Sequence, residues 1–137
     1  MLTPVDPRYL ARDWPYVRDG LQKIAAKTSD DWLPEDIYTD LRASPQTTGL
    51  YLLEYAGARI GFVVLQLIPQ YHAGPRLFVR AIWTEPGKGK AHRADIYDDL
   101  NEFARERGCV AIRMLSPRRW DGDGWTMKQY VFEREVV

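Results

Sequence analysis

One stretch of the sequence decides the fold, and it is IWTEPGKGKAHR at residues 82–93. It begins with residues typical of the end of a strand, passes through a glycine-rich basic turn, and continues into a helical pattern. A strand that leads through such a turn into a helix is the first half of a βαβ unit. The stretch therefore predicts an α/β fold with at least one pair of parallel strands.

The second half of that unit follows the stretch directly. From about residue 92 to residue 107 the apolar side chains fall on one helical face, and Gly108 then serves as a C-terminal cap. Residues 109–115 form an apolar strand after this helix. Strand, helix and strand together form a βαβ unit, so the strands at 77–84 and 109–115 are expected to be parallel and the crossover between them right-handed.

Upstream of the turn, the pattern predicts an antiparallel meander of three strands, at residues 49–55, 59–68 and 77–84. Ala56 and Gly57 form the turn between the first two strands. Residues 62–65 are apolar at every position, so the strand at 59–68 is expected to lie in the centre of the sheet.

Ahead of the meander, the sequence predicts a short strand at residues 1–5 followed by helices. Asp6-Pro7 has the form of a helix start, with Asp as N-cap, and Asp13 before Trp14 and Pro15 is a second such start. A further short helix opens at Pro34-Glu35-Asp36 and ends at Ser44-Pro45.

Together these elements predict a single α/β domain over residues 1–137. A last alternating strand at 130–137 completes a mixed, mostly antiparallel central sheet, flanked by helices and containing one parallel βαβ unit. A hydrophobic fraction of 45% and a charged fraction of 28% are ordinary for a globular domain of this length.

Charge and composition argue against several classes of protein. Lys+Arg and Asp+Glu are balanced at 19 each, so no overall field attracts nucleic acid or a membrane. A single cysteine, Cys109, allows no disulfide within the chain and is expected to be a buried thiol. Two distant histidines give no metal-ligand spacing, so no metal is expected. With no secretory signal and no apolar run long enough to span a bilayer, we expect a cytoplasmic protein.

The turn also has the chemistry of an anion site. Backbone N–H groups at a helix N-terminus attract anions, and small residues such as Gly89 let a pyrophosphate approach. Lys88, Lys90 and Arg93 add positive charge. The alternative is a solvated basic loop, because the turn lacks the lysine-serine/threonine ending of a P-loop and the three-glycine spacing of a dinucleotide-binding fingerprint.

The order of these elements resembles the GNAT superfamily of acyl-CoA-dependent N-acyltransferases. The resemblance covers nearly the whole chain, and its most specific part is the strand ending at residues 82–86. There Ile82 stands two residues before the β-branched Thr84 and four before Pro86, as in the family.

The turn is also similar to the family's phosphate loop, which has the form Gln/Arg-x-x-Gly-x-Gly/Ala. Lys88 stands at the basic position, Ala91 at the first glycine and Arg93 at the second. The resemblance implies acetyl-CoA or another short acyl-CoA as co-substrate, with the pyrophosphate on residues Lys88, Gly89, Lys90, Ala91 and Arg93. It also implies that the strand before the turn splays from its neighbour, so that backbone groups of Ala81, Ile82 and Trp83 hold the pantetheine arm and the acyl carbonyl.

The sequence departs from the family pattern in two places. Arg93 occupies a position that is small in the family. The family also has a helix whose tyrosine protonates the departing thiolate, followed by a Gly-aromatic pair, but here only residues 117–123 precede Gly124-Trp125. Trp120 falls at the tyrosine position, so the acid would be another residue, such as Tyr130, or a water.

An amine acceptor must lose a proton before it attacks a thioester, and three side chains are candidates for the base. Glu85 ends the strand at 77–84, Glu54 lies on the strand at 49–55, and His72 lies in a loop that can line a cleft. The alternative for each is an ordinary solvated surface side chain.

Two functions follow from the resemblance. The first is transfer of an acetyl or other short acyl group from acyl-CoA to a primary amine, on a small molecule or a protein. The second is a non-catalytic GNAT-like module that binds a partner or has a structural role, and its compact size and degenerate motifs also suit a virus- or mobile-element-encoded protein. A homodimer is a common outcome for domains of this size.

Overall fold

The computed structural model describes residues 1–27, 32–69, 72–115, 124–126, 134 and 136. Ten elements follow one another along the chain: β1 (Leu2–Pro4), η1 (Pro7–Tyr9), α1 (Leu10–Ala25), α2 (Pro34–Ala43), β2 (Thr48–Tyr55), β3 (Ala58–Ile68), β4 (Arg76–Thr84), α3 (Lys88–Ala91), α4 (Arg93–Glu106) and β5 (Ala111–Met114).

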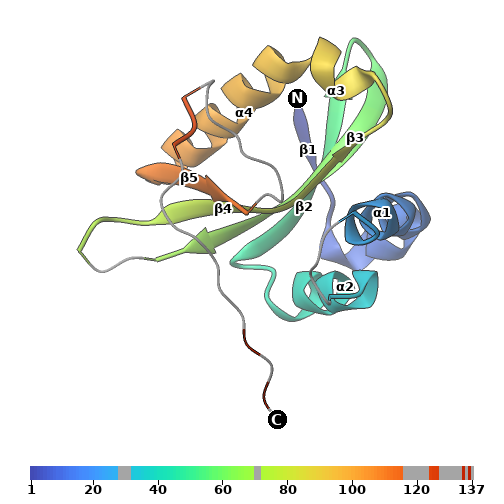
Figure 1. The fold of residues 1–137 in the computed structure, drawn as a ribbon, viewed down its shortest axis with the longest axis horizontal. Helices are drawn as coiled ribbons and strands as arrows, with labels where there is room; N and C mark the ends of the chain where they lie inside the picture. The colour runs from blue at the N-terminus through green and yellow to red at the C-terminus, as the bar shows by residue number, and fades with distance from the viewer. Residues whose placement is uncertain (28–31, 70–71, 116–123, 127–133, 135, 137) are drawn as a thin grey trace.

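The five strands form one sheet in the order β1-β2-β3-β4-β5 (Figure 1). Neighbouring strands are antiparallel except for β4 and β5, which are parallel and are joined through α3 and α4. Helices α1 and α2 cover one face of the sheet and α4 covers the other (Figure 1). The predicted mixed sheet, its meander and its parallel βαβ unit are confirmed.

Each face of the sheet has its own apolar core. On the α1/α2 side, Val17, Leu21 and Ile37 pack on Leu50, Phe62 and Val64 of β2 and β3. On the α4 side, Ile96 and Leu100 pack on Val63, Leu65 and Leu77. Strand β3 contributes to both cores, which confirms its predicted central position.

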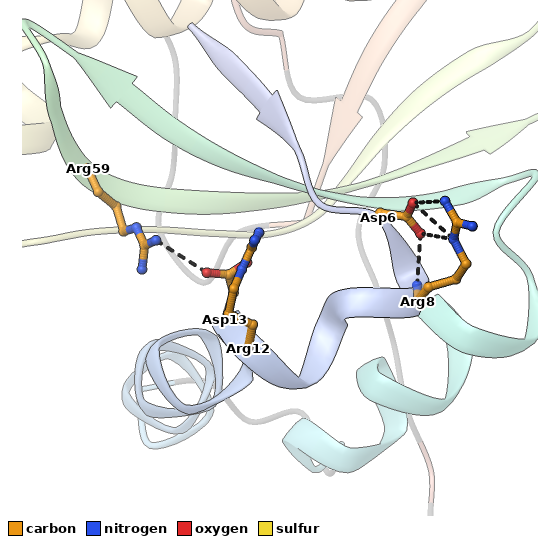
Figure 2. Close-up of polar contacts among 5 residues, drawn as sticks. All are labelled: Asp6, Arg8, Arg12, Asp13 and Arg59. Carbon is orange, nitrogen blue, oxygen red and sulfur yellow. Dashed lines mark hydrogen bonds and ion pairs between the residues drawn. The ribbon is translucent and has the colours of Figure 1, made fainter.

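The hairpin turn and the caps form where the sequence places them. Ala56 and Gly57 both have positive φ, at 53° and 76°, the backbone that a two-residue hairpin turn needs between twisted strands. Gly108 has a φ of 70° directly after α4. The Asp6 side chain accepts a hydrogen bond from the backbone N–H of Arg8 at 2.9 Å and so caps η1, as expected (Figure 2).

The predicted second helix start at Asp13 is wrong, because α1 already begins at Leu10. Asp13 lies inside the helix and is only 4% exposed. Its carboxylate does not cap the helix but accepts from Arg59 of β3 at 3.2 Å, and from Arg12 at 3.1 Å (Figure 2). Pro15 is tolerated within α1, where it removes one backbone hydrogen bond.

The C-terminal part of the chain is described only in places. β5 is shorter than the predicted strand at 109–115, and Cys109 before it is half-buried, where burial raises the pKa of its thiol against the opposing effect of Arg107. Most of the predicted strand at 130–137 lies outside the described residues. Among the helices that are described, none is long and apolar enough to cross a membrane.

Candidate functional site

Strands β4 and β5 pair over only part of their length. The register runs from Arg76 opposite Ala111 to Val79 opposite Met114, and β5 ends there. Residues 80–84 of β4 therefore have no strand partner on the β5 side within the part of the chain that the structure describes. No described strand pairs with their backbone groups on that edge, which is the stretch that the resemblance assigns to the pantetheine arm through Ala81, Ile82 and Trp83.

A β-bulge lies where the two strands part. On β3, Val64 faces Ala81 and the next residue, Leu65, faces Val79, so Arg80 is an extra residue in β4. The bulge reverses the faces of the strand: Val79 packs in the core under α4, whereas Ala81 and Trp83 pack on the α1/α2 side. Bulges commonly re-aim side chains next to functional sites.

The predicted phosphate turn forms two successive helix starts. Gly87 has a φ of 79° and leads into α3, and His92 is both the C-cap of α3 and the N-cap of α4. The expected single helix from residue 92 to 107 is therefore preceded by the extra turn α3. The first N–H groups of a helix have no acceptor within the helix, so Gly89 and Lys90 present donors here.

Helix α3 lies close to the end of β4. A Cβ atom at Gly89 would overlap the hydroxyl oxygen of Thr84, so only glycine lets the helix approach the strand this closely. Lys88, Lys90 and Arg93 are exposed around this turn. His92 joins α3 to α4 and stacks on the ring of Tyr55, with ring centroids 5.3 Å apart.

Glu85 lies between α3 and α1. Its backbone N–H donates to the carbonyl oxygen of Ile60 at 2.8 Å, and its carboxylate lies 3.7 Å from the ammonium of Lys88. On the α1 side, its carboxylate is close enough to Tyr16 to affect that hydroxyl. Burial first, and then the Glu85 charge, raise the pKa of Tyr16 to about 12, while Arg59 acts in the opposite direction.

Sequence reasoning missed Tyr16 and Arg59. Within the described residues the buried Tyr16 hydroxyl has no hydrogen-bond partner at normal distance and angle, and the Arg59 guanidinium lies 4.9 Å from the centre of its ring. Tyr16 also contacts Trp83 edge-to-face at 5.7 Å. No signal in the sequence could have found this group, because Tyr16 lies beside Glu85 only after α1 has packed across the ends of β3 and β4.

The other proposed bases lie elsewhere. His72 is exposed in the β3–β4 connection, at the opposite end of β4 from Glu85. The nine residues of β4 separate them by roughly 30 Å at the usual rise of a strand. Glu54 is half-buried near the end of β2. The structure thus places Glu85 beside the predicted phosphate turn and does not place His72 there, and Tyr130 lies outside the described residues.

Two further features bear on ligands. The structure describes no group of three His, Cys, Asp or Glu side chains that could hold a metal ion, among residues 1–27, 32–69, 72–115 and the few beyond. A groove of about 320 Å³ lies beside the start of β2, lined by Val5, Leu10 and Leu50 among others. Because β2 and β4 run in the same direction, this groove and α3 lie at opposite ends of the sheet.

Comparisons with known proteins show which solved structures share this fold. No protein-family model and no curated protein matches the chain. Among solved structures, a GNAT family acetyltransferase from Staphylococcus aureus aligns with a TM-score of 0.66 at 16% identity, over 99% of this chain and 98% of its own. A predicted acetyltransferase from Clostridium acetobutylicum, solved with acetyl-CoA, aligns with a TM-score of 0.59 at 17% identity, over 94% and 95%.

A third similar structure carries no activity in its name. It is an integron cassette protein from the mobile metagenome of Cole Harbour Salt Marsh, with a TM-score of 0.65 at 14% identity over 98% of this chain and 91% of its own. The alignments agree with the observed order of the strands in the sheet and with the separation of β4 from β5. The chain is a GNAT-like domain: it has the fold of the GNAT acetyltransferases.

Proposed function

We propose that this protein transfers an acetyl or other short acyl group from acyl-CoA to a primary amine. The observation that carries the proposal is the free edge of β4 at residues 80–84, meaning the edge with which no described strand pairs, and which leads directly to the helix starts at α3 and α4. The extended pantetheine arm of acyl-CoA, which leads to the phosphates, matches this arrangement. The arm can bond to a strand edge while its phosphates meet backbone N–H groups.

The residues present fit such a co-substrate. Gly89 lets α3 lie against Thr84 at the end of β4, because a side chain there would meet the threonine. Lys88, Lys90 and Arg93 supply positive charge around it, in a molecule whose formal net charge is zero. Backbone groups of Ala81, Ile82 and Trp83 would hold the arm and the acyl carbonyl. The bound acyl-CoA supplies an activated thioester, and the chain's own residues orient it and handle the acceptor's proton.

Glu85 is the proposed base. It comes directly after β4, two residues beyond Trp83, and lies beside the turn at α3. In this proposal its carboxylate, directly or through water, takes the proton that the amine loses on attack. His72 is the less favoured candidate because the length of β4 separates it from the turn. Tyr130 is the proposed acid for the departing thiolate.

One observation favours the second candidate, a non-catalytic module with this fold. The Glu85 carboxylate lies 3.7 Å from the Lys88 ammonium, so each charge partly neutralises the other. An ion pair there occupies the Glu85 carboxylate and offsets the positive charge that Lys88 would present to a phosphate. A module that only binds a protein partner would need neither a catalytic base nor a phosphate site.

A thermal-shift titration separates the two candidates. Acetyl-CoA, CoA and 3′-dephospho-CoA are each added to the wild-type protein, because a ligand that binds only the folded state raises its melting temperature by mass action. We expect saturable stabilisation by acetyl-CoA that falls in Lys88→Ala and persists in the control Lys27→Ala, an exposed lysine at the end of α1. An amine screen that detects released thiol then tests transfer. No shift at millimolar acetyl-CoA would favour the non-catalytic module.

A further inference from the structure

An ion pair joins α2 to the bulge in β4. The Nη1 atom of Arg80 donates to the Oδ2 atom of Asp40, and these residues are 40 positions apart in the sequence. Arg80 is the extra residue of the bulge, and its side chain is only 26% exposed. The pair therefore connects a helix on the sheet face to the point where β4 parts from β5.

The position of α2 is itself fixed. Ile37 and Leu41 bury its apolar side in the core, and Asp40 lies next to Leu41 on the same helix. The Nε atom of Arg18 on α1 also donates to Glu35 at 2.8 Å. Asp40 is thus presented from a helix that packing holds in place, and the exposed Arg18–Glu35 pair adds little to that.

We propose that Asp40 is a positioning residue: through Arg80 it holds the β4 bulge, and so sets the backbone of residues 80–83. A bulged residue lacks a partner on the neighbouring strand, so its backbone depends on what its side chain contacts. A half-buried, charge-assisted hydrogen bond restrains that side chain more than an exposed ion pair does. The effect on acyl-CoA rests on the proposed function, but the effect on the backbone does not.

Removing the Asp40–Arg80 ion pair should affect only one end of a bound acyl-CoA. The bulge lies at the end of the free edge farthest from α3, because residues 80–84 run from the bulge toward Thr84 and the turn. Loss of the ion pair should therefore disturb the acyl end of the site and spare the phosphate end. A ligand that consists only of the phosphate end should not sense the change.

Hydrogen exchange tests the backbone directly. Asp40→Asn removes the charge and keeps the shape, and Glu35→Gln is the matched control because Glu35 also pairs with an arginine of another element from α2. We expect amides of residues 80–83 to exchange about tenfold faster in Asp40→Asn and unchanged in Glu35→Gln. The double variant Asp40→Arg/Arg80→Asp should recover part of the protection. Equal exchange in all variants would overturn the inference, whether or not acetyl-CoA binds.

Binding tests the positioning role. Asp40→Asn should weaken acetyl-CoA about tenfold while adenosine 3′,5′-bisphosphate, a probe of the phosphate end, binds as to wild type. Equal weakening of both probes would contradict the inference and indicate a general loss of structure. A wild-type protein that binds neither probe would overturn the proposed function and the acyl-site role, while the exchange experiment would still decide whether Asp40 holds the bulge.

Discussion

Gly20 of α1 lies directly on Phe62 of β3. A Cβ atom at position 20 would come within 2.5 Å of the Phe62 ring and 2.9 Å of the Trp83 ring. The glycine therefore lets α1 pack onto the strands that form the candidate site, despite its low helix propensity.

Gly20→Ala should destabilise the protein. The gain in helix propensity is at most about 1 kcal/mol, whereas overpacking a full core costs about 1–3 kcal/mol, so a net loss of about 1 kcal/mol or more is expected. Phe62 is completely buried and has no space into which to move. Urea denaturation measures the free energy of unfolding, and Gln22→Ala, at an exposed position of α1, is the control. A Gly20→Ala protein as stable as wild type would show that α1 does not pack this closely.

Asp13 and Arg59 join α1 to β3, and the two arginines on Asp13 should differ in importance. Arg59→Met leaves a 4% exposed carboxylate with only Arg12 and should cost about 2–3 kcal/mol. Arg12 is 71% exposed, so Arg12→Ala should cost less than about 1 kcal/mol. Denaturation midpoints of both variants check the ranking. Equal losses would contradict the assigned roles.

The helix start at Asp13 shows what sequence patterns cannot predict. Asp-Trp-Pro has the local form of an N-cap, but the carboxylate finds a partner 46 residues away on β3. The meander and the βαβ unit were predictable because their signals, alternation and helical periodicity, are local. Partners that are brought together only by packing leave no such signal.

The bulge at Arg80 also could not be predicted from the sequence pattern. Leu77, Val79, Ala81 and Trp83 alternate regularly in the sequence, so β4 reads as one strand with a single inward face. In the structure the first two face α4 and the last two face α1 and α2. The free edge at residues 80–84 was expected from the family resemblance and not from the pattern of this chain.

Tyr16→Phe should alter the response to alkali. The pKa of Tyr16 is about 12 in the folded protein against 10.0 for an ordinary tyrosine, so folding disfavours the tyrosinate. This contribution to stability is fully present below pH 10 and is lost as the pH rises toward 12. The phenylalanine variant should lose less stability than wild type over that window. Denaturation at a series of alkaline pH values, with tyrosinate absorbance followed in parallel, makes the measurement.

At neutral pH the same variant should change stability by less than about 1 kcal/mol, because the buried hydroxyl makes no hydrogen bond that the change would remove. A large neutral-pH loss would mean that the hydroxyl bonds strongly to Glu85. Identical alkaline curves for the two proteins would contradict the assigned environment of Tyr16.

Gly89→Ala should weaken acyl-CoA binding with little effect on folding. The added methyl group would overlap the Thr84 hydroxyl and push α3 away from the end of β4. Misplacing the helix start by about 1 Å is expected to weaken acetyl-CoA about tenfold or more. Calorimetric titration measures the affinity, and Asn101→Ala, on the exposed side of α4, is the control. Unchanged affinity would argue against a phosphate site at α3.

We propose that the free edge of β4 and the turn at α3 form one acyl-CoA site. An NMR titration with acetyl-CoA, in which the chemical shifts of the backbone amides are followed, tests this proposal. We expect saturable chemical-shift changes concentrated at the amides of Ala81, Ile82 and Trp83, and of Gly89, Lys90 and Ala91. Saturable shifts confined to the groove around Val5, Leu10 and Leu50, or no shifts at millimolar acetyl-CoA, would contradict it.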